Sequence, residues 1–333
     1  MAEKPAYRIP SMLEILDLPW NGFNAISTFS GCGGSSLGYR MAGFRVLYAN
    51  EFIEAARDSY NANKADYTYV DSRDIRQVKG DEILKIIKLE KGQLDLLDGS
   101  PPCASFSTAG KRHKGWGTIK AYSDTKQRTD DLFFEFARLI SEIQPKVFIA
   151  ENVSGLIKGS AKGYYLEILK VLKDCGYRVK SKLLDAQWLG VPQARQRLIF
   201  IGVRNDLLLD PAYPMPFSYQ YMISDVLTYV KKIKVGGLAF DYRKANIVSP
   251  TIMQSDADRN ESAWLSGGGW IEDEANKKRK FTIDELKLIC AFPDDFILTG
   301  TYQQQWERLG RAVPPLMMKA IAETVRDKIL CRL

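Results

Sequence analysis

Cys103 is the side chain of this 333-residue sequence whose setting best suits covalent chemistry. It ends the run 99–103, in which two successive prolines fix φ and remove two N–H donors, so the chain follows a stiff, extended path. The preceding residues 94–98 are apolar enough for a buried strand, and open α/β sheets bind ligands at the carboxyl ends of parallel strands. A thiolate mounted there is a candidate nucleophile, whereas the alternative is an inert, buried cysteine.

Glu151 and Asn152 hold a comparable position in the sequence. They follow the apolar run 147–150, which predicts a second buried strand, so both side chains are expected on the same rim as Cys103. The sequence therefore predicts a thiol, a carboxyl group and an amide at one edge of a sheet.

Gln193, Arg195 and Arg197 alternate at the entrance to the apolar run 198–203, and this alternation sends all three to one face of a strand. Two cations directed at one place are costly unless they meet an anion or a polar ligand. An ordinary basic strand edge is the alternative interpretation of the same residues.

A glycine turn near the N-terminus indicates a ligand site. Residues 23–29 predict a strand, and Gly31 and Gly33 in the turn that follows let the backbone approach a ligand closely. Their spacing differs from the G-x-G-x-x-G dinucleotide fingerprint, so the turn alone does not identify the ligand.

Polar and aromatic residues after the next strands indicate a nucleoside. Glu51 and Phe52 follow the predicted strand 44–49, where a carboxylate suits ribose hydroxyls and a ring can stack on adenine. Asp74, further along, offers a carboxylate that can accept a hydrogen bond from an exocyclic amine. Taken singly, both acidic residues are also consistent with ordinary solvated carboxylates.

These candidate residues require strands and helices to alternate along the chain. The pattern predicts an α/β fold with a doubly wound, mostly parallel sheet. Strands 177–184 and 197–203 are expected to close it as a hairpin-type element. Helices are expected over residues 36–42, 55–63, 130–143, 164–175, 282–290 and 315–330.

The pattern changes after residue 203, where prolines interrupt it and aromatic residues crowd together. The chain is therefore divided into a main domain followed by a small mixed lobe and a return to the main domain. The expected parts are an N-terminal extension (1–22), the main domain (23–203), the small lobe (204–250) and an insert with the C-terminal return (251–333).

Composition narrows the class of protein. The sequence has no secretory segment and no apolar run of membrane-spanning length, so we expect a cytoplasmic protein without membrane contact. Five scattered cysteines without a C-x-x-C pair, and a single histidine, predict neither a disulfide framework, a metal site nor a histidine-based triad. The net charge of +7 favours a polyanionic partner.

Five ordered motifs resemble those of the cytosine-C5 DNA methyltransferases, from residue 26 to the C-terminal helix. They are Phe29-Ser30-Gly31-Cys32-Gly33-Gly34, Pro101-Pro102-Cys103, Glu151-Asn152-Val153, Gln193-x-Arg195-x-Arg197 and Gly310-x-Ala312-Val313-Pro314-Pro315. The resemblance implies a Rossmann-like methyltransferase sheet with a small target-recognition lobe. It also implies a monomer that methylates double-stranded DNA with S-adenosyl-L-methionine, releases S-adenosyl-L-homocysteine and needs no metal.

The resemblance assigns roles to the residues singled out above. Cys103 would attack C6 of a cytosine flipped out of the duplex, which activates C5 toward the methyl sulfonium. Glu151 would donate a proton at N3, Arg197 would hold O2 and Arg195 would brace the catalytic loop, while a water near Asn152 would remove the C5 proton. The implied cofactor contacts are Phe29, Gly31, Gly33, Glu51, Phe52, Asp74, Ile75, Ser100, Pro101, Leu132, Arg311, Ala312 and Val313.

The basic segment after Cys103 suits a loop that closes on DNA and meets phosphates. A solvated basic loop is the alternative. The expected DNA contacts are Ser105, Ser107, Lys111, Arg112, His113, Lys114 and Trp116.

The chain departs from the family pattern in three places. Ala104 stands where family members often carry Gln to fill the gap left by the flipped base, and Arg311 stands where the last motif usually has Asn. The recognition region is short, about 204–247, which predicts a short target site. The later insert 254–280 is expected either to add DNA contacts or to form a surface loop.

Two other functions are consistent with the same motifs. One is the same chemistry on a transfer RNA cytosine, and the other is a non-catalytic DNA-binding relative. Intact Cys103, Glu151 and Arg197 argue against a binding protein, which needs none of them. The resemblance also admits a cognate restriction endonuclease as a partner, in a bacterial or phage source.

Overall fold

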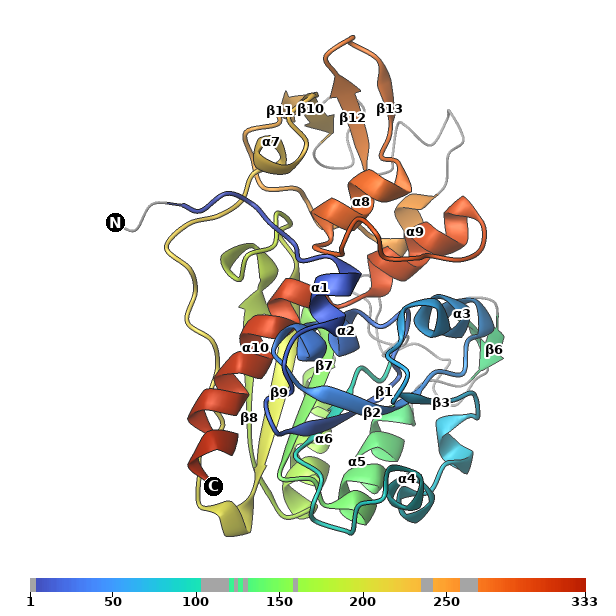
Figure 1. Cartoon of the computed structure of the whole chain (residues 1–333), viewed down its shortest axis with the longest axis vertical. Coiled ribbons are helices and arrows are strands. Elements are labelled where there is room, and N and C mark those ends of the chain that lie inside the picture. Colours follow the sequence, from blue (N-terminus) through green and yellow to red (C-terminus); the bar gives the residue numbers. More distant parts are fainter. Residues whose placement is uncertain are drawn as a thin grey trace.

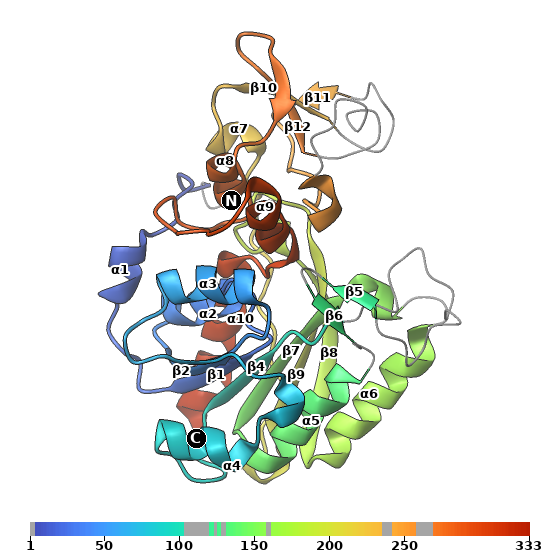
Figure 2. The same ribbon diagram turned by 90° about the vertical axis from the view of Figure 1, so that its right-hand side faces the viewer.

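The computed structural model describes residues 4–102, 120–122, 125–127, 131–157, 161–234, 242–257 and 269–333. A large lobe built around a sheet carries a smaller lobe, as Figures 1 and 2 show. None of the helices in these described ranges combines the length and apolar character needed to cross a bilayer.

The large lobe contains a seven-stranded sheet in the order β3-β2-β1-β4-β7-β9-β8. Its neighbouring strands are parallel except at β9, which is antiparallel to both β7 and β8. This confirms the predicted doubly wound, mostly parallel sheet and its antiparallel closing pair. The strands are β1 (Asn24–Thr28), β2 (Arg45–Asn50), β3 (Tyr69–Asp71), β4 (Leu96–Gly99), β7 (Val147–Val153), β8 (Tyr177–Asp185) and β9 (Gln196–Arg204).

Parallel pairing brings the carboxyl ends of the central strands together. Thr28 of β1 pairs with Asn50 of β2 and with Gly99 of β4, and Gly99 pairs with Ala150 of β7. The residues that follow these strand ends therefore emerge at one edge of the sheet. Because β9 runs in the opposite direction, its first residues reach the same edge.

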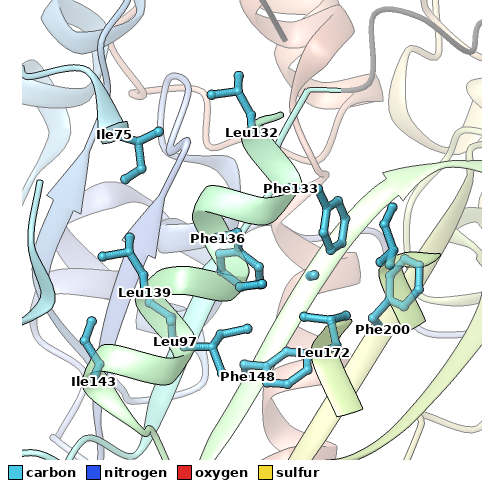
Figure 3. Close-up of a cluster of buried hydrophobic side chains, with 14 of the residues drawn as sticks. Ile75, Leu97, Leu132, Phe133, Phe136, Leu139, Ile143, Phe148, Leu172 and Phe200 are labelled. Carbon is cyan, nitrogen blue, oxygen red and sulfur yellow. The ribbon is translucent and has the colours of Figure 1, made fainter. Parts of the chain in front are cut away.

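Helices cover both faces of the sheet. Helices α4, α5 and α6 pack on one face, where Phe136 of α5 and Phe148 of β7 belong to a large buried apolar cluster (Figure 3). Helices α2 and α10 pack together on the other face. The bounds are α2 (Gly34–Met41), α3 (Glu54–Asn63), α4 (Gly80–Ile87), α5 (Leu132–Ile143), α6 (Lys162–Asp174) and α10 (Pro315–Lys328).

The small lobe contains a four-stranded antiparallel sheet in the order β11-β10-β12-β13. The expected lobe boundary at residue 250 cuts through this sheet, because β12 and β13 come from the segment 254–280. These strands are part of the lobe and not a surface loop. Its elements are α7 (Ile223–Val226), β10 (Val230–Lys234), β11 (Tyr242–Lys244), β12 (Trp270–Asp273), β13 (Lys278–Lys280), α8 (Ile283–Ile289) and α9 (Tyr302–Arg311), and a separate pair is β5 (Lys120–Tyr122) with β6 (Thr125–Gln127).

The N-terminal extension contacts both lobes. The hydroxyl of Tyr7, in this extension, donates a 2.9 Å hydrogen bond to the carbonyl of Leu288 in α8. Ile15, in helix α1 (Met12–Leu16), is buried in the same apolar cluster as Leu37 of α2. The extension therefore links the small lobe to the helix that follows the glycine turn.

Candidate active site

The turn after β1 has a left-handed backbone at Phe29 (φ 54°), Gly31 (φ 57°) and Gly33 (φ 99°). A Cβ atom added at Gly31 would meet no atom within 4 Å, so the space beside this residue is open to a ligand. At Gly34, by contrast, a Cβ atom would lie 2.4 Å from the carbonyl oxygen of Val313. The turn therefore packs through Gly34 against the segment before α10, whereas the space beside Gly31 stays open.

Glu51 ties the glycine turn to the loop after β2. Its carboxylate accepts hydrogen bonds from the backbone N–H of Gly31 and from that of Ile53, each at 2.7 Å. Burial raises the pKa of this carboxyl, and the two N–H groups and the charge of Arg308 oppose that rise. The neighbouring Phe52 is 40% exposed, so its ring is available to a ligand.

Asp74 follows β3, the strand next to β2. Its side chain is 26% exposed and is paired with Arg76, so the carboxylate lies within reach of a ligand. Ile75 and Leu132 remain predicted cofactor contacts, and their side chains are each 3% exposed and belong to the hydrophobic core. Their periodic apolar neighbours explain this placement, because both residues begin segments that pack inward.

Glu151, near the end of β7, faces the first residues of β9. Its Oε1 lies 2.7 Å from Nε of Arg197, and the two side chains are largely buried. Burial raises the pKa of the Glu151 carboxyl, while the charges of Arg197 and Arg195 and a hydrogen bond from Ser100 lower it. The net shift is upward, so the carboxyl is held closer to its protonated form than a free carboxyl would be.

Arg195 is buried and braces other parts of the chain. Its Nη1 donates to the carbonyl of Ile252 at 3.0 Å, and its Nη2 donates to that of Gly310 at 2.7 Å. Burial lowers its pKa to about 9, and the charge of Arg197 acts in the same direction. The two arginines therefore differ in role, since it is Arg197 that forms the ion pair with Glu151.

Asn152 connects β7 to the residues that lead to Cys103. Its Nδ2 donates a 3.2 Å hydrogen bond to the carbonyl of Pro101, and its Oδ1 accepts from the N–H of Val153. Both ends of the amide are thereby fixed. The extended proline segment is held at the same edge of the sheet as Glu151.

Arg311 is the last residue of α9, and its side chain contacts a residue one turn earlier in the same helix. Its Nε lies 2.8 Å from Oε1 of Glu307. Ala312 and Val313 then pass behind the glycine turn, where the Ala312 side chain would lie 3.3 Å from a Cβ at Gly34. The structure thus brings the last motif to the first, as a shared site requires.

Cys103 and Ala104 lie outside the described residues, and the residues expected to contact DNA in the segment after Cys103 do so too. These are Ser105, Ser107, Lys111, Arg112, His113, Lys114 and Trp116. In the part of the chain that the structure describes, no cluster of His, Cys, Asp and Glu is arranged to hold a metal ion.

Sequence reasoning missed two charged residues close to these strand ends. Asp98 of β4 is 1% exposed, and its carboxylate accepts hydrogen bonds from the hydroxyls of Tyr39 at 2.8 Å and Ser27 at 3.0 Å. A carboxylate inside an apolar strand was the available signal. Arg76, which contacts Asp74, carries no comparable signal, because its second partner, Asp131, is 55 positions away in the sequence.

The fold and the site together define an enzyme of the Rossmann-like methyltransferase class. The chain belongs to the C-5 cytosine-specific DNA methylase family, whose model matches residues 23–234 and 216–327. It is therefore a DNA cytosine-5 methyltransferase, which is the enzyme class expected from its motifs.

Relatives with similar sequences span nearly the whole chain. The Type II methyltransferase M.NgoPII of Neisseria gonorrhoeae is 34% identical over 352 residues, covering 93% of this chain and 97% of that protein. The Type II methyltransferase M1.HphI of Haemophilus parahaemolyticus is 30% identical over 331 residues, covering 90% of this chain and 86% of that protein.

Solved structures share the fold at lower identity. DNMT2 of Spodoptera frugiperda matches with a TM-score of 0.68 and 19% identity, covering 92% of this chain and 99% of that one. An E. coli prophage-encoded protein, described as a DNA modification methyltransferase, matches with a TM-score of 0.68 and 21% identity over 93% of this chain and 100% of that one.

Proposed function

We propose that this enzyme transfers a methyl group from S-adenosyl-L-methionine to C5 of a flipped-out cytosine within a short, specific sequence of double-stranded DNA. The observation that carries the proposal is the buried ion pair of Glu151 and Arg197 at the strand edge reached by Pro101. A carboxyl group with a raised pKa beside a fixed guanidinium suits a pyrimidine ring, which needs a proton donor at N3 and a cation at O2.

The residues at the ends of β1, β2 and β3 fit the cofactor. The open space at Gly31 accommodates a ligand against the backbone, and the fixed carboxylate of Glu51 suits ribose hydroxyls. The exposed ring of Phe52 can stack on adenine, and Asp74 can accept from its amine. When bound, the cofactor supplies an electrophilic methyl group.

Cys103 is proposed as the nucleophile. Its thiolate forms a bond to C6 of cytosine while the electron pair of the C5–C6 double bond moves toward N3, where Glu151 donates a proton. C5 then accepts the methyl group from the sulfonium, which releases S-adenosyl-L-homocysteine. A base next removes the C5 proton, Cys103 leaves as thiolate, and N3 returns its proton to Glu151. A water held near Asn152 is the candidate base, and Arg195 braces the surrounding segments.

DNA contacts are proposed for the segment that follows Cys103. A cytosine inside a duplex does not expose C6 to a thiol, so the base must be flipped out, and a basic loop can close over it by contacting phosphates. The small lobe is proposed to read the bases. Because the recognition region is short, about 204–247, we expect it to read few of them.

Transfer to DNA can be tested with oligonucleotide duplexes that carry 5-fluorocytosine, which traps the adduct because C5 holds no removable proton. We expect a cofactor-dependent covalent complex with DNA, none with matched RNA, and none with Cys103→Ala. Adduct formation with RNA alone would instead support the transfer RNA alternative. An absence of any adduct or methyl transfer on mixed genomic DNA would support a non-catalytic relative.

The names of the relatives suggest a wider role. We propose that the enzyme acts as a cytoplasmic monomer that protects DNA against a cognate restriction endonuclease. Base-resolution mapping of 5-methylcytosine in DNA from cells that express the protein would give the target sequence. Scattered methylation without a common sequence would contradict this role.

A further inference from the structure

We propose that Arg76 is the positioning residue for adenine recognition, because its guanidinium fixes the Asp74 carboxylate to the start of α5 and aims it at the 6-amino group of the cofactor. This inference rests on the proposed cofactor site. It adds to that site a residue that the sequence motifs did not single out.

Arg76 contacts two carboxylates at once. Its Nη1 lies 2.9 Å from Oδ2 and 3.1 Å from Oδ1 of Asp74. Its Nε lies 3.1 Å from Oδ2 of Asp131, and its Nη2 lies 2.7 Å from Oδ1 of the same residue. A planar guanidinium can satisfy both carboxylates with separate N–H groups, whereas a lysine ammonium lacks this fixed geometry.

The two carboxylates differ in how firmly they are anchored. Asp131 directly precedes α5, which buries one face in the main hydrophobic cluster (Figure 3). Asp74 precedes a single 3₁₀ turn, Ile75–Gln77, and its side chain caps that turn by accepting from the N–H of Arg76. The guanidinium therefore joins a short, locally held turn to a long, buried helix.

Asp74 retains the capacity to bind a ligand while it is held by Arg76. Its side chain is partly exposed, and Oδ2 accepts the Nη1 hydrogen bond and has a second lone pair available. The turn is also tied to β2, because Nδ2 of Asn50 donates to the carbonyl of Arg73 at 2.9 Å. This ties the turn that carries Asp74 to the end of β2, after which Glu51 follows.

A fixed carboxylate discriminates between nucleobases. The adenine amine donates a hydrogen bond to it, whereas the 6-oxo group of hypoxanthine presents an acceptor that repels the carboxylate and donates nothing to it. A mobile Asp74 would lose this preference. Arg76 should consequently set the ratio of affinities for adenosyl and inosyl ligands more than it sets the stability of the fold.

The experiment is calorimetric binding of S-adenosylhomocysteine and S-inosylhomocysteine to the full chain and its variants. For Arg76→Gln we expect the affinity for the adenosyl ligand to fall about tenfold, the range for one charge-assisted hydrogen bond, with little change for the inosyl ligand. Arg76→Lys should show most of the same loss and provides the test if Arg76→Gln does not fold.

Arg204 provides a matched control. Like Arg76, it is a partly buried guanidinium that pairs with a carboxylate, here Asp206. Its Nη1 also donates to two backbone carbonyls, and it is the last residue of β9, at the end of the strand away from the site. Arg204→Gln should lower thermal stability and leave the affinity ratio unchanged. Adding Arg76→Gln to Asp74→Asn should not change the ratio further, because Arg76 acts through Asp74.

The binding data distinguish a failure of the proposed cofactor site from a failure of the role of Arg76. If the wild-type chain binds neither ligand, the proposed cofactor site is wrong. If it prefers the adenosyl ligand and Arg76→Gln keeps that preference, or weakens both ligands equally, the role of Arg76 is overturned and the cofactor site stands.

Discussion

Nε of Arg197 lies 2.7 Å from Oε1 of Glu151 across two antiparallel strands. In the register of β7 and β9, Arg197 is opposite Val153, so Glu151 is its diagonal neighbour on the same face. Burial favours the protonated carboxyl, whereas the guanidinium favours the carboxylate. The acidity of Glu151, the proposed proton donor, therefore depends on Arg197.

Replacing Glu151 with Gln removes the acid and keeps the side-chain size. We expect the single-turnover rate of methyl transfer to fall by about 10²-fold, the usual scale of acid–base contributions. Cofactor affinity should stay within about twofold, because Glu151 lies on β7 and the proposed adenosyl contacts follow β1 to β3. Glu323→Gln on the surface of α10 is a suitable control. A wild-type rate in Glu151→Gln would rule out the acid role.

Arg197→Gln should change the pH dependence as well as the rate. Because the Arg197 charge lowers the pKa of Glu151, its removal raises that pKa further, so the protonated acid persists to higher pH. The limb of the single-turnover pH profile that reports loss of this proton should move to higher pH. The plateau should fall at least about tenfold as the proposed cation at O2 is lost. A limb that moves to lower pH would contradict the coupling.

Asn152→Ala should make the proline segment that precedes Cys103, the proposed nucleophile, less firmly positioned. It removes the hydrogen bond to the Pro101 carbonyl, whose net contribution to stability is about 1 kcal/mol. We expect slower trapping of 5-fluorocytosine DNA with unchanged affinity for S-adenosylhomocysteine. Trapping at the wild-type rate would show that the prolines position Cys103 without this contact.

Much of the site could be predicted from sequence because each proposed functional group follows an apolar strand. Glu51 and Ser100 come directly after β2 and β4, and Glu151 follows the apolar run 147–150 within β7. Parallel pairing of β1 with β2 and β4, and of β4 with β7, places these positions at one edge of the sheet. To predict such a position, it is enough to recognise an apolar run that forms a parallel strand and the polar residue that follows it.

Contacts between distant segments could not be predicted in this way. Arg76 and Asp131 are separated by 55 positions, and no local pattern pairs them. The lobe boundary failed for the same reason, because β10 pairs with β12 across a long intervening segment.

Asp98 should make stability depend on pH in the direction opposite to most carboxylates. Burial raises its pKa to about 7, with the Glu151 charge adding to the rise and the hydrogen bonds from Tyr39 and Ser27 opposing it. The folded protein therefore binds a proton that the unfolded chain, with a carboxyl pKa near ~4, has already released. The stabilising contribution is complete below about pH 4 and is lost as pH rises through about 7.

Asp98→Asn mimics the protonated side chain at every pH and isolates this effect. The free energy of unfolding of the variant, minus that of the wild type, should increase between pH 5 and 8 with a slope of up to about 1.4 kcal/mol per pH unit. Urea unfolding at several pH values measures both proteins under identical conditions. A difference that stays constant or shrinks over this interval would show that Asp98 is ionised in the folded enzyme throughout. The Tyr39 and Ser27 hydroxyls would then outweigh its burial.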